Sequence, residues 1–406
     1  MFSMKQFILY KSKSLFVVLL LLLSFTQGCK PTTKSTNNHS ESALDIADSI
    51  LYNILNLYDA PRFGLLTETY PINPDHRVSY LADESAQKKE QEVSFLWPYS
   101  GIISGTISLY KESTDNKYLS LLKDRLLPGL ELYWDTTRVP YSYQSYPTFA
   151  GHSDRFYDDN VWLALDFCTL YETTQESKYL ERAKDLYTFI YSGWSDELGG
   201  GIFWCEQKRK SKNTCSNAPA TVLGVKLYEL TNDELYLEKA IETYKWTKDN
   251  LLDPADNVYW DNISLEGTVD KRKYTYNSGQ MIEAAVLLYK HTKEKDYLSD
   301  AQKTAFASYQ FFTKYKDTVN GEQLFYPNSP WFNVILFRGL KALCSIDKNP
   351  EYINTIRENA YYAWYHTRDG NGLFGNDWSQ KDEGKFKWLL DNACMVELFS
   401  QLSSIE

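Results

Sequence analysis

Two adjacent carboxylates, Asp158 and Asp159, stand just before a long apolar run that begins at Val161. A turn-like segment of Gly, His, Ser and Asp at 151–154 precedes them, so the pair falls at the start of a predicted helix. Acids at this position commonly cap a helix, because its first turn has unpaired N–H groups and the positive end of the helix dipole. The alternative is catalytic: one carboxylate attacks a sugar while the other protonates the leaving oxygen, as in glycosidases.

The chemistry open to this pair follows from the closeness of its two charges. Two neighbouring carboxylates cannot both ionise easily, so the pKa of one is raised while the other stays ionised. One group is then ready to attack and the other ready to donate a proton. Consecutive helical side chains diverge by about 100°, so the two groups could reach different sides of a bound sugar. Proximity alone does not say which carboxylate has which role.

The elements that must position this pair form a repeat with a period of about 58 residues, too long for the common helical repeats. In each unit an apolar segment precedes an amphipathic one, which indicates a buried helix followed by a helix with one wet face. Successive units are 61, 57, 61 and 55 positions apart, measured between Tyr118, Tyr179, Tyr236, Tyr297 and Tyr352. Because buried and partly exposed helices alternate along the chain, we expect an inner ring of buried helices surrounded by an outer ring of partly exposed ones.

The sequence predicts six outer and six inner helices, which is enough to form a closed ring. Outer helices are expected at 43–58, 117–133, 177–192, 234–250, 295–314 and 350–366, and inner helices at 97–111, 158–172, 216–230, 276–291, 331–345 and 387–402. These six hairpins predict an all-α domain, an (α/α)6 toroid or barrel. An open solenoid of the same hairpins is the alternative, but it would need a polar cap, and the C-terminal run 388–402 is apolar.

The loops that lead into the inner helices of such a ring converge on one mouth. They are rich in Trp and Tyr, which offer flat apolar faces with polar handles, and in Asn. Any one of these residues is more often a cap, a turn residue or part of the core, but their common location favours substrate binding. The candidate binding residues are Trp97, Asn160, Trp204, Asn217, Tyr276, Asn277, Gln280 and Asn333.

Four motifs stand out in these loops: Tyr157-Asp158-Asp159-Asn160, Gly199-Gly200-Gly201-Ile202-Phe203-Trp204, Asn217-Ala218-Pro219-Ala220, and Thr275-Tyr276-Asn277 with Gly279-Gln280. Together they resemble glycoside hydrolase family 76, the bacterial endo-α-1,6-mannanases. The resemblance implies an (α/α)6 fold, no metal or cofactor, and hydrolysis of an α-1,6-mannan backbone with retention at the anomeric carbon. By position, Asp158 would be the nucleophile and Asp159 the acid/base. Ser278, where the family pattern leads us to expect Gln, and the long loop 208–216 are departures.

The N-terminal segment has the pattern of a lipoprotein signal. Three lysines precede an apolar run at 15–25 that is too short to span a bilayer, and Gly28-Cys29 follows it. We therefore expect a signal peptide at 1–28, lipidation of Cys29, a flexible tether at 29–42 and a catalytic domain at 43–406. The expected location is the outer membrane, facing the periplasm or the cell surface, with the membrane contacted through the lipid on Cys29.

The charge narrows the choice of partner. Removal of the three signal lysines takes the formal net charge from −10 to −13, which argues against nucleic acid or an anionic membrane surface as partner. A neutral mannan chain fits this charge, and we expect a monomer. Cys205 and Cys215 share a polar loop and form either a disulfide or two free thiols; no His lies near them, so we do not expect a metal site there.

Two other functions compete with a mannan hydrolase. A sugar epimerase on the same toroid would want positioned bases, often His, but the chain has five His residues, in the tether, in loops and at helix ends. A lipid-anchored, non-catalytic protein that captures mannan would use the same aromatic loops. Only the Asp158–Asp159 pair distinguishes this binder from the hydrolase.

Overall fold

The computed structural model describes residues 41–405, apart from 74, 79–80 and 83–91. The expected signal peptide, Cys29 and the expected tether up to residue 40 lie outside the described residues. Residues 41–406 form one compact unit. The expectation of an all-helical barrel is confirmed in that this unit is mostly helical, with strands of only two to five residues.

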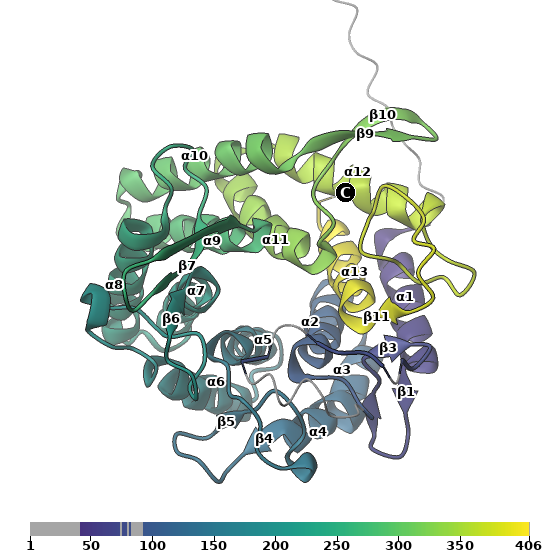
Figure 1. Ribbon diagram of the computed structural model, residues 1–406, viewed down its shortest axis with the longest axis horizontal. Helices are drawn as coiled ribbons and strands as arrows, with labels where there is room; N and C mark the ends of the chain where they lie inside the picture. Colours follow the sequence, from purple (N-terminus) through teal and green to yellow (C-terminus); the bar gives the residue numbers. More distant parts are fainter. Residues whose placement is uncertain (1–40, 74, 79–80, 83–91, 406) are drawn as a thin grey trace, which may run out of the picture. The chain divides into compact units, whose positions relative to one another are not determined.

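In the part of the chain that the structure describes, six helices form an inner ring and pack against one another in cyclic order, with the last contacting the first (Figure 1). Each is buried over most of its surface, as expected for helices that are apolar nearly all round. They are α2 (Leu96–Ser113), α5 (Tyr157–Thr174), α7 (Thr214–Thr231), α9 (Thr275–Thr292), α11 (Pro330–Asp347) and α13 (Leu389–Leu402).

The outer helices lie around this ring, each beside an inner helix. Their wet faces carry the charged residues, and their buried residues recur at helical spacing, as at Tyr179, Ala183 and Leu186. They are α1 (Ala43–Leu57), the short α3 (Asn116–Leu121) and α4 (Leu127–Leu130), α6 (Ser177–Tyr191), α8 (Glu234–Leu251), α10 (Lys295–Phe312) and α12 (Glu351–His366).

Glycines allow two of the inner helices to approach closely. A Cβ on Gly279 of α9 would lie 2.4 Å from the Leu336 Cα of α11, and one on Gly339 would lie 2.1 Å from the Gly279 carbonyl oxygen. No side chain fits at such distances, so any larger residue would push α9 and α11 apart.

The helix expected at 117–133 is present as an uninterrupted helical run over residues 116–133, but its hydrogen-bonding pattern changes along its length. After α3 the chain makes a π-helical turn over Leu122–Leu126, continues as α4 and ends in a 3-10 turn at Glu131–Tyr133. Pro128 has no N–H to bond to the preceding turn, which forces the helix to change its hydrogen-bonding pattern there. Gly129 lies against the Tyr99 ring, and the Tyr99 hydroxyl donates to the Leu126 carbonyl at 3.1 Å.

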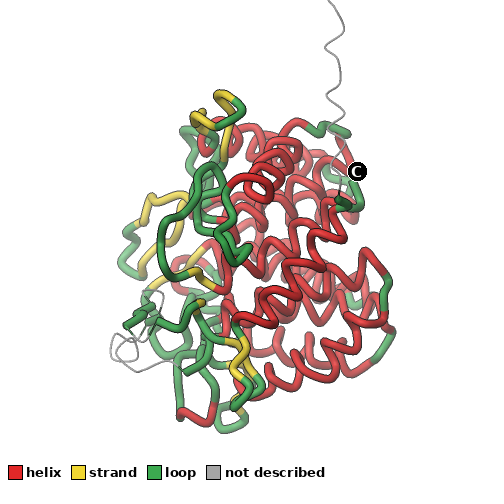
Figure 2. Tube along the Cα trace, turned by 90° about the vertical axis from the view of Figure 1, so that its right-hand side faces the viewer, coloured by secondary structure: helices red, strands yellow, loops and turns green. Residues whose placement is uncertain are grey.

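Short strands and loops gather at one end of the helices, the end where the inner helices begin (Figure 2). The described residues form five antiparallel sheets: β1 (Asp59–Ala60) with β2 (Leu65–Leu66), β3 (Thr69–Tyr70) with β11 (Lys387–Trp388), β4 (Trp134–Asp135) with β5 (Ser142–Tyr143), β7 (Trp260–Ser264) with both β6 (Ser211–Asn213) and β8 (Val269–Lys273), and β9 (Lys314–Thr318) with β10 (Gly321–Phe325). Among the helices described, none is long and apolar enough to cross a membrane.

Candidate active site

A cavity of about 540 Å³ opens at the end where the inner helices begin. Its wall combines many aromatic rings with few charges: three carboxyl groups and one guanidinium. The lining residues are Trp97, Phe156, Asp158, Asp159, Trp162, Trp204, Ser211, Asn213, Cys215, Asp261, Asn262, Arg272, Tyr274, Tyr276, Trp331, Phe332 and Trp388. The carboxylate pair singled out from the sequence therefore faces a space large enough for sugar units.

The start of α5 is held by a short antiparallel pairing with the segment that carries Trp204. Tyr157 N donates to the Trp204 carbonyl at 3.0 Å, and Glu206 N donates to the Arg155 carbonyl at 3.0 Å. Phe156 and Cys205 form the bridge between these bonds. Because the two segments are in this register, the Trp204 indole lies beside the first turn of α5.

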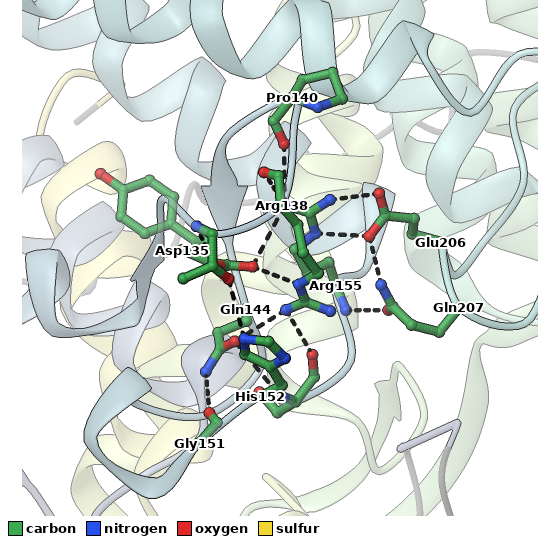
Figure 3. A network of polar contacts seen from close by, with 12 residues as sticks. Asp135, Arg138, Pro140, Gln144, Gly151, His152, Arg155, Glu206 and Gln207 are labelled. Carbon is green, nitrogen blue, oxygen red and sulfur yellow. Dashed lines mark hydrogen bonds and ion pairs between the residues drawn. The ribbon is translucent and has the colours of Figure 1, made fainter.

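Arg155 also holds this region in place, through the contacts shown in Figure 3. Its role was not predicted from the sequence. The side chain is fully buried and donates to the Arg138 and Pro140 carbonyls at 3.0 and 2.9 Å and to Glu206 Oε2 at 2.6 Å. Asp135 lies 3.5 Å from the same guanidinium. Arg155 therefore ties the loop before α5 to the segment that carries Trp204.

Asp158 accepts three hydrogen bonds. Its Oδ2 accepts from Trp204 Nε1 at 3.0 Å and from the Cys215 thiol at 3.2 Å, and its Oδ1 accepts from the Asp159 N–H at 3.1 Å. Burial raises the pKa of Asp158 to about 6, and these donors oppose the rise because they stabilise the charged form.

Asp159 has a different environment. Among the described residues, no donor lies within hydrogen-bonding distance of its carboxyl group. Burial raises the pKa of Asp159 well above its ordinary range, and the negative charge of Asp158 raises it further. Asp158 is therefore the member of the pair that ionises first, and Asp159 retains its proton.

An aromatic wall faces the pair. Trp331 packs edge-on against both Trp97 and Trp162 with centroids 5.2 Å apart, and Phe332 stacks on Tyr276 at 4.2 Å. The Trp388 ring contacts Trp97 at 5.4 Å. These rings come from α2, α5, α9, α11 and from β11 directly before α13, so the cavity wall is shared by most of the inner ring.

Asp261 and Arg272 form a second polar group at the cavity and were also missed from the sequence. They belong to β7 and β8, and Arg272 NH2 lies 3.6 Å from Asp261 Oδ2. Burial raises the pKa of Asp261. Sequence reasoning missed them because β7 and β8 are an excursion between α8 and α9 that the helical repeat does not predict.

The predicted binding residues separate into two groups. Trp97, Trp204 and Tyr276 line the cavity, together with Asp158 and Asp159. The other five are not in its lining and are almost completely buried: Asn160, Asn217, Asn277, Gln280 and Asn333. The positions of these five residues do not favour direct contact with a bound sugar chain.

Three asparagines on the inner helices anchor loops instead. Asn160 Oδ1 accepts from Tyr143 N at 2.9 Å, and Asn160 Nδ2 donates to the Tyr143 and Phe156 carbonyls at 3.0 and 2.8 Å. Asn217 makes the same bonds to Ile202 and Asn213. Asn392 repeats them with Phe374 and Trp388. We call these three residues the loop-anchoring asparagines.

The remaining amides have other roles. Asn333 bonds Thr275 Oγ1 and the Pro327 carbonyl. Gln280 donates to Glu283 at 2.8 Å, while its Oε1 is buried without a partner. Asn277 is fully buried on α9. Ser278, noted as a departure from the family pattern, accepts from Tyr259 N at 3.2 Å and so anchors a loop.

The two cysteines left open by the sequence are free thiols. Cys205 is buried beside Gln207, whereas Cys215 reaches the cavity and Asp158. In the part of the chain described, no cluster of three or more His, Cys, Asp or Glu side chains has the arrangement of a metal site.

Comparison with known proteins agrees with this geometry. The family model of glycosyl hydrolase family 76 matches residues 42–406. The fold and the acidic cleft thus belong to a glycosidase, and the chain is a member of glycosyl hydrolase family 76. The resemblance stated from the sequence is confirmed.

Solved structures from bacteria are similar over nearly the whole domain. The family 76 mannosidase Bt3792 from Bacteroides thetaiotaomicron is 28% identical with a TM-score of 0.80, covering 89% of this chain and 98% of that one. An inactive variant of the α-1,6-mannanase GH76A of Salegentibacter, in which two consecutive aspartates are replaced by asparagine, was solved with α-1,6-mannotriose. It is 26% identical with a TM-score of 0.71, covering 90% of this chain and 100% of that one.

Curated relatives match over shorter stretches. The meiotically up-regulated gene 191 protein of Schizosaccharomyces pombe is 28% identical over 181 residues, which is 41% of this chain and 40% of that protein. The chain thus spans less than half the length of this relative.

Proposed function

We propose that this protein is an endo-acting hydrolase of α-1,6-mannosidic linkages in a mannan backbone, and that it acts with retention at the anomeric carbon. The observation that carries the proposal is the unequal environment of two adjacent acids: three donors surround Asp158, and none of the described residues donates to the Asp159 carboxyl. The mannotriose complex of the Salegentibacter relative supports the choice of substrate.

In the proposed mechanism Asp158 is the nucleophile. It is the carboxylate that ionises first, and it attacks the anomeric carbon to give a glycosyl-enzyme. Asp159 keeps its proton at neutral pH and passes it to the leaving oxygen. After the leaving sugar has departed, the Asp159 carboxylate takes a proton from water, and that water releases the sugar from Asp158.

The neighbouring position of the two acids supports retention. Carboxyl groups in retaining glycosidases lie about 5–5.5 Å apart, whereas inverting enzymes need about 6.5–9.5 Å to place a water molecule. Adjacent residues of one helix turn cannot easily reach the upper part of the second range. The aromatic wall around Trp331 supports binding of several sugar units, because indole and phenol rings stack on their apolar faces.

The test is incubation of the purified protein with linear α-1,6-mannan, followed by proton NMR of the anomeric signals and separation of the products. We expect a mixture of oligosaccharides whose new reducing ends first appear in the α configuration. First products in the β configuration would refute retention, and mannose released alone would refute endo action. Tight binding without cleavage would favour the alternative, a mannan-capture protein.

We further propose that the domain is an (α/α)6 toroid of six hairpins and that it is monomeric. The cyclic packing of the inner helices supports the toroid. The N-terminal pattern supports a lipid anchor on Cys29 at the outer membrane. Cys29→Ser should move the protein from the membrane fraction to the soluble fraction with unchanged hydrolysis. Native protein in the soluble fraction with a free N-terminal amine would refute the anchor.

A further inference from the structure

We infer that Cys215 is a positioning residue for the proposed reaction: its thiol, together with the Trp204 indole, holds one oxygen of Asp158 and keeps that carboxylate ready to attack. This inference rests on the proposed function, since it assigns a task within that mechanism. It concerns a residue that the sequence analysis considered only as a disulfide partner of Cys205 or a free thiol, and to which the family resemblance gave no role.

Cys215 lies directly beside the Asp158 carboxylate. Cys215 is the second residue of α7, is 5% exposed and lines the cavity. Its Sγ lies 3.2 Å from Asp158 Oδ2, the oxygen that also accepts from Trp204 Nε1. Two donors from separate elements on one oxygen leave little rotational freedom to the carboxyl group. The other oxygen, Oδ1, accepts from the Asp159 N–H.

A third inner helix contributes to the same part of the cavity. Tyr276, from the start of α9, lines the cavity together with Cys215 and Asp158. The contact between Cys215 and Asp158 therefore lies beside the aromatic wall, of which Tyr276 is a part.

The thiol remains a donor over the working pH range. Burial and the nearby carboxyl groups of Asp158 and Asp261 raise the pKa of Cys215 well above its ordinary value. A protonated thiol beside an ionised carboxylate can only donate, so it stabilises the charged form of Asp158. Cys215 is for the same reason a poor nucleophile, because reactivity requires the thiolate.

The other groups around Asp158 do not duplicate this contact. Asp159 on α5 and Asp261 on β7 are acids and disfavour a second negative charge. Cys205 lies on the segment paired with α5, with its sulfur turned to Gln207. Arg272 on β8 pairs with Asp261 and Asp270, so within the described residues Asp158 relies on hydrogen-bond donors and has no cation as partner.

The experiment compares the pH dependence of kcat/KM on an α-1,6-mannan oligosaccharide for wild type, Cys215→Ala, Cys215→Val and Cys215→Ser. Loss of a donor to the charged form raises the pKa of Asp158. In Cys215→Ala and Cys215→Val the acid limb of the kcat/KM profile should therefore move to higher pH by about one unit. In Ser, which keeps a donor, it should stay near the wild-type position. Cys205→Ala is the matched control, a buried thiol close by whose loss should leave the limb in place.

Two results would overturn the inference. If the limb of Cys215→Ala or Cys215→Val coincides with that of wild type, the thiol does not act on Asp158. If Cys215→Ser moves as far as Cys215→Ala, side-chain volume rather than the donated proton is responsible. Melting curves for each variant identify any that fail to fold, and Val, which retains the bulk, replaces Ala in that case.

A readout independent of activity separates this inference from the proposed function. Carboxyl carbon NMR of aspartate-labelled protein, with the Asp158 signal assigned through Asp158→Asn, reports the titration directly. An upward shift in Cys215→Ala supports the positioning role even if wild type cleaves no mannan. An unchanged titration overturns the role even if wild type is active.

Discussion

The two ends of the inner helix ring hold acidic side chains in opposite ways. At the end where the helices begin, the cavity contains Asp158, Asp159 and Asp261 with one guanidinium, Arg272. At the end where they finish, a second cavity of about 370 Å³ contains five acids and five cations. These ten residues are Glu112, Asp166, Glu172, Glu283, Glu397, Lys111, Lys226, Lys290, Arg338 and Lys341.

Ion pairs join several of the charges in the second cavity. Arg338 donates to both oxygens of Glu397, and Lys226 lies 3.2 Å from Glu172. Asp166 instead accepts from Ser104 at 2.6 Å, and burial raises its pKa to about 7. The ends of parallel helices also differ in dipole: anions are favoured near their starts and cations near their last turns. The mouth follows that rule. Within the described residues, two of its three acids, Asp158 and Asp159, have no cation beside them, whereas Asp261 lies 3.6 Å from Arg272.

The difference separates charges that hold the fold together from charges kept for chemistry. A buried acid with a cation beside it remains ionised and structural. A buried acid with neither cation nor donor keeps its proton and can give it away. Substitutions that remove an acid at the mouth, or one member of an ion pair in the second cavity, test this distinction.

The largest effect should follow from removing an acid at the mouth. Asp158→Asn and Asp159→Asn should each lower hydrolysis of α-1,6-mannan by on the order of 10³-fold or more, because each removes a reacting group. Asp159→Asn should be milder on a substrate whose leaving group needs no proton. Initial rates on both substrates measure this, with melting curves to show that the fold is intact. An active double variant would contradict the catalytic assignment.

Removing an ion pair from the second cavity should instead lower the stability of the fold. Arg338→Met leaves Glu397, whose side chain is 2% exposed, buried without its partner. We expect a loss of about 3–5 kcal/mol in the free energy of unfolding, measured in urea. The double variant with Glu397→Leu should recover most of it. Hydrolysis at a temperature where the single variant is folded should be close to wild type; a loss comparable to that of Asp158→Asn would remove the distinction between the two ends.

An intermediate effect is expected from a donor at the mouth. Trp204→Phe keeps the ring but removes the N–H that donates to Asp158. Hydrogen bonds to charged groups contribute about 1.5–3 kcal/mol, so kcat/KM should fall about 10–100-fold and its acid limb should move to higher pH. Trp194→Phe, a tryptophan outside the cavity lining, is the control. A pH profile identical to wild type would show that Trp204 acts only through its ring.

The smallest effect is on stability as a function of pH. The pKa of Asp158 is raised to about 6 in the folded protein, so between about pH 4 and 6 the folded state binds more protons than the unfolded state. Stability from this group is complete below its unfolded pKa and is lost as pH rises through about 6. Asn does not titrate, so Asp158→Asn should melt a few degrees higher than wild type at pH 7 but not at pH 4. A constant difference across this range would argue against a raised pKa.

The helices could be predicted from the sequence because the pattern that defines them is long. The structure starts α6 at the expected residue and α5 and α9 one residue earlier than expected. Apolar residues all round, or on one face, persist over four or five turns and do not depend on distant contacts. The helical run 116–133, whose hydrogen-bonding pattern changes along its length, contains Pro128 and Gly129.

The site was predicted less completely. The acid pair and the aromatic residues were found because their types are unusual at a helix start. Asn160 and Asn217 anchor loops and do not line the cavity, and an amide that anchors a loop looks the same in a sequence as one that binds sugar. The roles of Arg155, Asp261 and Cys215 were not predicted, because they depend on the register of the 155–157 and 204–206 segments and on the β6–β7–β8 sheet.

The loop-anchoring asparagines have a consequence for how this scaffold can change. Asn160, Asn217 and Asn392 each fasten one loop residue, through both its N–H and its carbonyl, to the first turn of the helix concerned. These attachments are separate, and each uses main-chain groups that any loop residue except proline provides. The rim can therefore be exchanged one segment at a time, by evolution or by grafting, while the helices beneath it remain the same.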